Sequence, residues 1–148
     1  MNVIVIEDEK PAARRLKRML QKLDIEVQVM LHSVEESLNW FQTNEEPDLI
    51  FLDIQLSDGL SFEIFEELTI HSAIIFTTAY DEYAIKAFEV NALDYLLKPI
   101  EPKRLSDAIQ KLHYEIQKEQ ASAQNGRSLL TEDDQVFVKD GEKCWFVK

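Results

Sequence analysis

Side chains that could do chemistry stand at the ends of four short apolar segments of this 148-residue chain. In chain order they are Glu7 and Asp8, then Asp53, then Thr77 and Thr78, and finally Lys98. Three carboxylates in one crevice would repel one another and raise one another's pKa unless a cation neutralised them. Mg²⁺ is the expected cation, because it prefers a few carboxylate oxygens and keeps waters that a phosphoryl oxygen can replace.

A carboxylate, a hydroxyl and an ammonium beside a Mg²⁺ site suit the transfer of a phosphoryl group to the carboxylate. Asp53 is the predicted nucleophile, because carboxylates can form acyl phosphates. Lys98 and the metal would offset the negative charge of the transferring group. Of the two hydroxyls, Thr78 is favoured, since side chains alternate along a strand and Thr77 then points to the opposite face.

For these side chains to meet, the apolar segments must be neighbouring strands. Continuous apolar runs are typical of strands buried on both faces of a parallel sheet. Five such runs occur, at residues 3–6, 27–30, 49–52, 73–77 and 93–97. Amphipathic helical patterns separate them. The alternation predicts an α/β fold with a doubly wound five-stranded parallel sheet of order 2-1-3-4-5. The strand order then reverses between the first and third strands, where Glu7, Asp8 and Asp53 converge.

The helical patterns rest on apolar residues three or four positions apart. The fourth is formed by Tyr83, Ala84, Ala87 and Phe88, and the fifth by Leu105, Ile109, Leu112 and Ile116. The fifth pattern fades near Gln117, so residues 1–118 are predicted to form the α/β domain. Residues 119–128 are poor in apolar side chains and contain Asn125-Gly126, which indicates a linker.

The last segment, residues 129–148, carries two strand-like runs around Asp140-Gly141 and predicts a β-hairpin. A lone two-stranded hairpin is marginally stable in water. The segment is therefore interpreted as the opening of a second domain that is cut short at Lys148.

The composition limits the binding partners and the cellular location that can be expected. The formal net charge is −12, which argues against the whole chain binding a phosphate backbone. The single cysteine excludes a disulfide framework and favours a reducing, cytoplasmic location. No apolar run approaches the roughly 20 residues that span a bilayer, so no membrane association is expected.

Four motifs together resemble the receiver domain of a bacterial two-component response regulator. They are VIEDE at residues 5–9, LIFLDI at 49–54, FTTA at 76–79 and DYLLKP at 94–99. The stretch TAYDEYA at residues 78–84 is similar to the LytTR-type subgroup, and FVKDG at 137–141 is similar to the start of the LytTR DNA-binding domain. The resemblance covers residues 1–118 and implies the flavodoxin-like receiver fold.

The resemblance also implies roles for single residues. Asp53 would accept a phosphoryl group from a histidine kinase, and Lys98 would contact that group. The Mg²⁺ ligands would be Glu7, acting through water, Asp8, Asp53 and the main-chain carbonyl of Gln55. Thr78 would hydrogen-bond the phosphoryl group, Tyr95 would be the aromatic side chain that turns inward when the hydroxyl shifts, and Lys98-Pro99 would be a cis peptide.

Two features depart from the common receiver pattern, the loop after Asp53 and residue 7. Ser57 stands where most receivers carry proline, and Gly59 comes about two residues earlier than their glycine. Glu7 replaces the commoner aspartate, and its extra methylene favours an outer-sphere role.

The expected function is therefore a phosphorylation-controlled switch rather than an enzyme acting on a separate substrate. Phosphorylation would change self-association through a face made by the fourth helix, fifth strand and fifth helix. Charged residues on or near that face are Lys86, Glu89, Asp94, Lys103 and Arg104. A phosphorylated homodimer would place two full-length C-terminal domains on DNA.

Other interpretations start from the same residues. Glu7, Asp8 and Glu9 could cap the following helix, and Tyr95 could be a core aromatic. An aspartyl-phosphate phosphatase for small molecules would usually carry a second aspartate two residues after the nucleophile, where this chain has Gln55. A mononucleotide-binding protein would need a loop rich in Gly, Ser or Thr after the first strand, and acids there repel phosphate.

Overall fold

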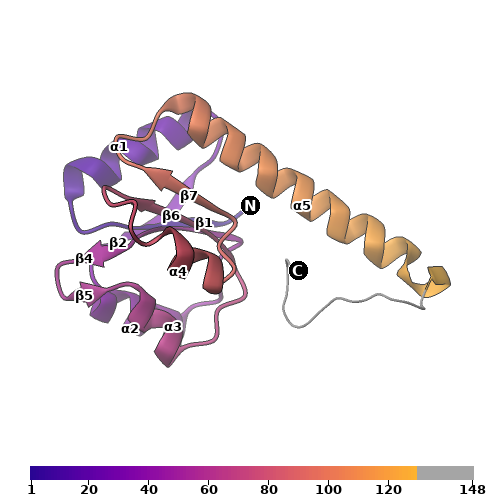
Figure 1. Cartoon of the computed structure of the whole chain (residues 1–148), viewed down its shortest axis with the longest axis horizontal. Helices are drawn as coiled ribbons and strands as arrows, with labels where there is room; N and C mark the ends of the chain where they lie inside the picture. Colours follow the sequence, from indigo (N-terminus) through magenta and orange to yellow (C-terminus); the bar gives the residue numbers. More distant parts are fainter. Residues whose placement is uncertain (130–148) are drawn as a thin grey trace. The chain divides into compact units, whose positions relative to one another are not determined.

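A computed structural model of the chain describes residues 1–129, with side chains up to residue 119 (Figure 1). In chain order the elements are β1 (Val3–Ile6), α1 (Lys10–Gln21), β2 (Val27–Leu31), α2 (Val34–Thr43), β3 (Leu49–Asp53), β4 (Gln55–Leu56), β5 (Gly59–Leu60), α3 (Phe62–Glu67), β6 (Ala73–Thr78), α4 (Ala84–Glu89), β7 (Asp94–Leu97) and α5 (Pro102–Leu129). Strands and helices alternate as the sequence predicts, with one additional short hairpin, β4–β5.

The main sheet has five strands in the order β2-β1-β3-β6-β7, and every neighbouring pair is parallel. Because β6 and β7 are the predicted fourth and fifth strands, this order confirms the predicted 2-1-3-4-5 arrangement. The strand order reverses between β1 and β3, as expected.

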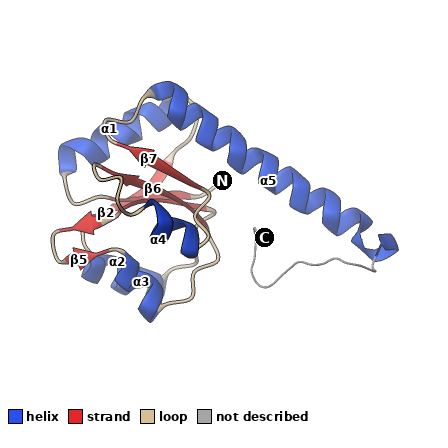
Figure 2. Ribbon diagram, in the orientation of Figure 1, coloured by secondary structure: helices blue, strands red, loops and turns tan. Residues whose placement is uncertain are grey.

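The central strands have unbroken apolar sequences because they are buried. Every residue of β1, β3 and β6 is buried. Helix α1 lies on one face of the sheet, whereas α2, α3 and α4 lie on the other (Figure 2). Strands covered on both faces have no solvent side, so their sequences show no polar alternation.

The register of the strands brings their carboxyl ends to one edge. Ile6 of β1 is level with Leu52 of β3, and Asp53 is level with Thr77 of β6. Thr78 is in turn level with Leu97 of β7. The residues that follow these positions therefore leave the sheet side by side, which is the geometry that the candidate site requires.

The loop after Asp53, which departs from the receiver pattern at Ser57 and Gly59, forms the hairpin β4–β5. Gln55 pairs with Leu60 and Leu56 with Gly59, so Ser57 and Asp58 form the turn. Gly59 has a φ of +149°, and a Cβ at this position would lie 2.7 Å from the Glu63 side chain. Glycine is therefore favoured here by the backbone conformation, whereas the flexible Glu63 carboxylate could move away from a Cβ. Two-residue strands lie below the length at which a sequence pattern is visible.

On helix α4, one residue that was predicted to face inward, Phe88, faces outward. The sequence pattern put Phe88 inside with Ala87, but Phe88 is 82% exposed whereas Ala87 is buried. The helix has only six residues, and the inward positions continue from Tyr83 to Ala87, four residues apart. Phe88 therefore comes to the outer side with Ile85.

The chain divides into one unit of residues 1–106, which contains the sheet, and a second unit that begins at Asp107 within α5. Helix α5 continues to Leu129, past the helix end predicted near Gln117 and through the segment predicted as a linker, residues 119–128. The predicted hairpin around Asp140-Gly141 lies outside the described residues. In the part of the chain that is described, no helix combines the length and apolar character that crossing a bilayer requires.

Candidate functional site

Three carboxylates converge at the carboxyl edge of the sheet. Glu7 and Asp8 follow β1, and Asp53 ends β3; one carboxylate oxygen from each lies within 4.8 Å of the others. Glu7 and Asp53 are buried, being 3% and 6% exposed, and Asp8 is half-buried. The structure therefore brings together the acids that the sequence assigned to one crevice.

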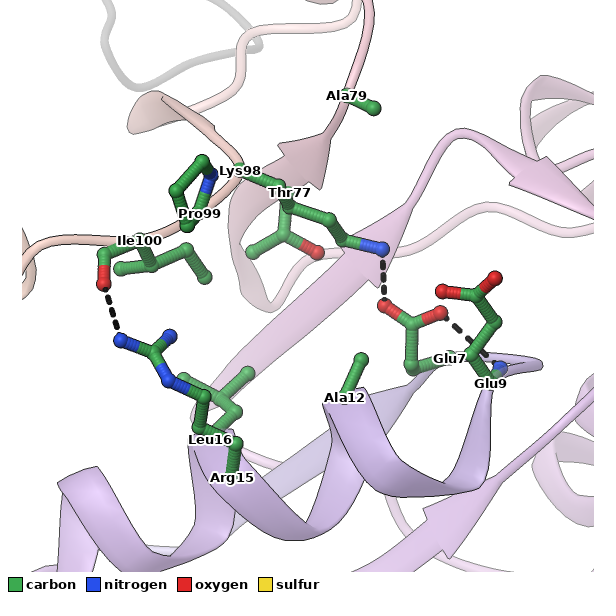
Figure 3. A pocket seen from close by; sticks show the side chains of 10 residues that line it. All are labelled: Glu7, Glu9, Ala12, Arg15, Leu16, Thr77, Ala79, Lys98, Pro99 and Ile100. Carbon is green, nitrogen blue, oxygen red and sulfur yellow. Dashed lines mark hydrogen bonds and ion pairs between the residues drawn. The ribbon is translucent and has the colours of Figure 1, made fainter.

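Lys98 enters the same crevice from the end of β7. Its Nζ lies 2.6 Å from Glu7 Oε1 and 3.1 Å from Asp53 Oδ2. Figure 3 shows the ammonium pointing at the Glu7 carboxylate from across the sheet edge. The main-chain N–H of Glu9 donates to the other oxygen of Glu7 at 3.1 Å. Three carboxylates and one ammonium leave a formal charge of −2 in this space.

The burial and proximity of these charged groups shift their pKa values. Burial, together with the charge of Asp53, raises the pKa of Glu7 to about 7, although Lys98 acts in the opposite direction. Burial also raises the pKa of Asp53, again against the influence of Lys98. Burial alone would lower the pKa of Lys98, but its bonds to Glu7 and Asp53 raise it, so the ammonium stays charged. The site thus holds excess negative charge that a cation would relieve.

The donor set fits Mg²⁺. Magnesium takes hard oxygen ligands, uses one or two carboxylates and keeps several waters. Glu7, Asp8 and Asp53 offer carboxylate oxygens close enough to share one ion, and the formal charge of −2 matches a divalent cation. The predicted ligand role of the Gln55 main-chain carbonyl stays a prediction.

Magnesium affinity is expected to depend on pH, because the cation competes with the proton that Glu7 binds with a pKa of about 7. Below that pH, affinity should rise by up to about tenfold per pH unit, as expected for displacement of one proton, and then level off. Titration calorimetry from pH 5.5 to 8.5 measures this. An affinity that is constant over the whole range would contradict it.

In the absence of metal, the free energy of unfolding should fall as pH rises, whereas the affinity for Mg²⁺ should increase. Between the unfolded value of 4.5 and about 7, the folded protein holds a proton on Glu7 that the unfolded chain has lost. The contribution of Glu7 to the free energy of unfolding should therefore be largest below pH 4.5. It should be lost as pH rises through 7. The raised pKa of Asp53 acts in the same direction. Urea unfolding at several pH values, with and without Mg²⁺, tests the sign.

The two threonines at the end of β6 occupy different places. Both are buried. Thr77 lines a cavity of about 460 Å³ beside Lys98 and Ala79 (Figure 3). Thr78 Oγ1 accepts the main-chain N–H of Tyr80 at 3.3 Å. The phosphoryl contact assigned to Thr78 stays a prediction, and its hydroxyl would have to leave this bond to make it.

Tyr95 is half-buried on β7, and its hydroxyl donates to the main-chain carbonyl of Tyr80. Burial and the nearby acids Asp81 and Glu82 raise its pKa, so the hydroxyl keeps the proton that it donates. Tyr95 and Thr78 therefore both bind the same residue, Tyr80, in the loop that precedes α4.

The acids after β1 do not cap α1. Glu9 occupies the N-cap position, but its side chain makes no capping hydrogen bond. Glu7 and Asp8 belong instead to the carboxylate cluster. Pro11 opens the helix, where a missing N–H has no effect on the helical hydrogen bonds.

Residues 3–110 match the family of response regulator receiver domains. The chain belongs to this family. The receiver is 42% identical over 115 residues to the sensory transduction protein LytT of Bacillus anthracis, across 75% of this chain and 46% of that protein. It is 39% identical over 140 residues to the transcriptional regulatory protein BtsR of Salmonella typhi, across 93% of this chain and 56% of that protein. The chain thus spans about half the length of these relatives.

Solved structures agree with the fold. The response regulatory domain of protein mrkE from Klebsiella pneumoniae has a TM-score of 0.70 and 31% identity, covering 77% of this chain and 96% of that chain. The LytT relatives confirm the LytTR-type subgroup that residues 78–84 indicated. The Lys98-Pro99 peptide is cis, as the receiver resemblance predicted.

Sequence reasoning missed the contacts that hold the receiver's acidic loops. His32 was given no role, because the three histidines lie far apart in the chain, yet its ring contacts the main chain of Glu7. Gln55, considered for its carbonyl and as the residue in place of a second aspartate, uses its side-chain amide to donate to the Tyr83 hydroxyl at 3.0 Å. Neither contact has a signal in sequence spacing, since each joins residues at least 25 positions apart.

Proposed function

We propose that this receiver accepts a phosphoryl group on Asp53 with the help of Mg²⁺ and so controls a transcription output. The observation that supports this most is the convergence of Glu7, Asp8 and Asp53 with one lysine at the carboxyl edge of the sheet. A receiver domain implies a histidine kinase as phosphodonor, and that partner is part of the proposal.

The chemistry is a transfer between two nucleophiles. An Asp53 carboxylate oxygen forms a bond to phosphorus as the bond from phosphorus to the donor nitrogen breaks, and the imidazole leaves. Lys98 Nζ, already 3.1 Å from Asp53, stabilises the charge on the phosphoryl oxygens. Magnesium held by Glu7, Asp8 and Asp53 supplies further positive charge when it is bound. Nothing in this scheme requires a separate substrate, so we propose that the receiver catalyses only its own phosphorylation and dephosphorylation.

Residue 55 supports this proposal over a small-molecule phosphatase. A hydrolase of that kind needs a general acid two residues after the nucleophile, and an amide cannot fill that role. The Gln55 amide is instead bonded to the Tyr83 hydroxyl.

The switch is proposed to act through the loop before α4. When Thr78 Oγ1 turns to the phosphoryl group, it releases the N–H of Tyr80. Tyr95, which donates to the carbonyl of Tyr80, then loses its fixed partner and can turn inward. Both events change the chain that enters α4.

The outer face of α4 and β7 is suited to self-association. Ile85 is 77% exposed, Phe88 82% and Leu97 49%, so three large apolar side chains face solvent here. Among the charged residues on or near this face, Asp94 and Arg104 pair with each other within the chain at 3.2 Å. We propose that phosphorylation makes this face dimerise and so pairs two C-terminal domains on DNA, as the relatives' names in transcription suggest.

Dimerisation is expected to require the exposed apolar side chains. With Mg²⁺ and beryllofluoride, a phosphoryl mimic, the wild-type receiver should shift toward dimer in analytical ultracentrifugation. Phe88→Ser should weaken that dimer by at least about fivefold, because an aromatic anchor residue typically contributes more than about 1 kcal/mol to an interface. Glu66→Ser, at an exposed position on α3 outside this face, is the control. A Phe88→Ser receiver that dimerises like the wild type would reject this face.

Mass spectrometry tests the chemistry directly. Incubation with acetyl phosphate and Mg²⁺ should add one phosphoryl group to the intact receiver, and EDTA should prevent the gain. Peptide mapping should locate the group within the segment that contains Asp53. A protein that gains no mass with Mg²⁺ present would overturn the proposed function.

A further inference from the structure

Both main-chain polar groups of Glu7 are held by the end of β2. Its N–H donates to the carbonyl of Leu31 at 2.9 Å. Its carbonyl oxygen lies 2.9 Å from His32 Nδ1. Because a carbonyl can only accept, His32 Nδ1 carries the proton and donates it. The histidine therefore fixes the peptide from which Glu7 and Asp8 project.

His32 is itself held by the start of α2. Its main-chain N–H donates to Glu36 Oε1 at 2.8 Å. Glu36 in turn donates its main-chain N–H to Ser33 Oγ, the N-cap of α2, at 3.0 Å. The orientation of His32 is thus coupled to the capping of this helix.

The same helix terminus is bound from the other side by Asp58. The main-chain N–H of Val34 donates to Asp58 Oδ1 at 2.8 Å, and that of Glu35 donates to Oδ2 at 3.0 Å. Desolvation alone would raise the pKa of Asp58, but the main-chain donors together lower it, so the carboxylate stays charged. Figure 1 shows the β4–β5 hairpin, whose turn carries Asp58, beside the start of α2. That hairpin begins two residues after Asp53.

The start of α2 therefore joins the loop that carries Glu7 and Asp8 to the hairpin that follows Asp53. His32 connects it to the loop of Glu7 and Asp8, and Asp58 connects it to the hairpin that follows Asp53. Neither side chain belongs to the carboxylate cluster. In the absence of a cation the clustered acids repel one another, so loops without such ties would move apart.

We propose that His32 and Asp58 are positioning residues that set the separation between the loop of Glu7 and Asp8 and the hairpin after Asp53, and thereby the affinity for Mg²⁺. This inference rests on the proposed metal function. Magnesium tolerates little deviation from its preferred ligand geometry, so a small change in loop separation weakens binding. Residues that orient metal ligands typically change affinity by 10- to 100-fold when replaced. Both residues here act through the main chain, so we expect the lower end of that range.

A purely structural role makes a different prediction. If the two ties only stabilise α2, their loss would lower the unfolding midpoint and leave the affinity of the folded protein unchanged. Metal affinity measured under conditions where every variant is folded therefore separates the two roles.

The test uses Mn²⁺ as the probe, with free ion counted by electron paramagnetic resonance. His32→Ala and Asp58→Asn should each bind Mn²⁺ about tenfold more weakly than the wild type. His32→Asn should restore most of the affinity, because its amide nitrogen is the same number of bonds from the main chain as Nδ1 and can donate to Glu7. The double variant His32→Ala/Asp58→Asn should lose less than the product of the two single losses, since both act through one helix terminus.

Glu46→Gln is the matched control. Glu46 Oε1 accepts the main-chain N–H groups of His71 and Ser72 at 2.7 and 3.0 Å, a similar tie between loops. It lies at the opposite edge of the sheet, because Glu46 precedes β3 and Ser72 precedes β6. Its removal should leave Mn²⁺ affinity unchanged.

The possible outcomes are distinct. Affinities of His32→Ala and Asp58→Asn within twofold of the wild type would overturn the inference, as would an equal loss in Glu46→Gln. Independent, multiplying losses in the double variant would overturn the shared role of α2. A wild-type receiver that binds no Mn²⁺ would instead overturn the proposed metal site.

Discussion

Asp53→Asn is expected to abolish the gain of a phosphoryl group from acetyl phosphate and Mg²⁺. The amide keeps the size of the side chain at the end of β3 but is not nucleophilic enough to form an acyl phosphate. Of the two carboxylates that remain, Asp8 lacks the contact with Lys98 that Asp53 has, and both oxygens of Glu7 are already bonded, to Lys98 Nζ and to the main-chain N–H of Glu9. Intact-mass spectrometry of both proteins under identical conditions measures the loss, which should be complete.

The same variant should remain folded. Asp53 is a buried carboxylate beside buried Glu7, and its charge contributes to the raised pKa of Glu7. Removing that charge relieves repulsion, so the metal-free Asp53→Asn receiver should unfold at a temperature no lower than the wild type at pH 8. A phosphoryl group that still appears in Asp53→Asn, on whatever residue, would contradict the assignment of the acceptor.

Lys98→Met is expected to slow phosphorylation by about 100-fold or more. Lys98 supplies a cation to the space shared by Asp53 and Glu7, at 3.1 and 2.6 Å. Removing one preorganised donor from a developing oxyanion typically reduces the rate by 10²- to 10³-fold. The rate of mass gain with acetyl phosphate and saturating Mg²⁺ measures this effect separately from metal affinity.

Loss of Lys98 should also be visible in stability. Glu7 and Asp53, both buried, would lose the ammonium that offsets their charge. Lys98→Met should therefore lower the free energy of unfolding more at pH 8 than at pH 5, where the carboxylates can bind protons. Lys22→Met, at the exposed C-cap of α1, is the control and should change neither the rate nor its pH dependence. A Lys98→Met receiver phosphorylated at the wild-type rate would remove Lys98 from the mechanism.

These predictions depend on the chemistry at the strand ends, which the sequence identified well. The runs at residues 3–6 and 49–52 are apolar because both faces of β1 and β3 are covered, so their composition alone indicates a parallel sheet. In such a sheet the carboxyl ends meet at one edge, which places Asp8 and Asp53 together without knowledge of any contact. The order of the sheet was predicted from the order that is common in five-stranded doubly wound sheets, and no residue pattern specifies it.

Local patterns were less informative where an element is short. Phe88 was expected to face inward, but a six-residue helix has room for few inward positions, and Ala87 takes one of them. The β4–β5 hairpin has two residues in each strand, which is too few for an alternation of apolar and polar residues to predict it. Its turn was visible only as Ser57-Asp58-Gly59, a departure from the receiver pattern.

The sequence by itself determined the positions of the five strands, the three acids and the lysine, because these depend on periodicity and on where strands end. Only the tertiary structure decided how those side chains are held. The 2.6 Å contact of Lys98 with Glu7 joins β7 to β1 across the sheet edge, and the bond from His32 to Glu7 spans 25 positions in the chain. Such contacts form between segments that meet only after folding, and no local pattern encodes the distance or direction of a side chain from another segment.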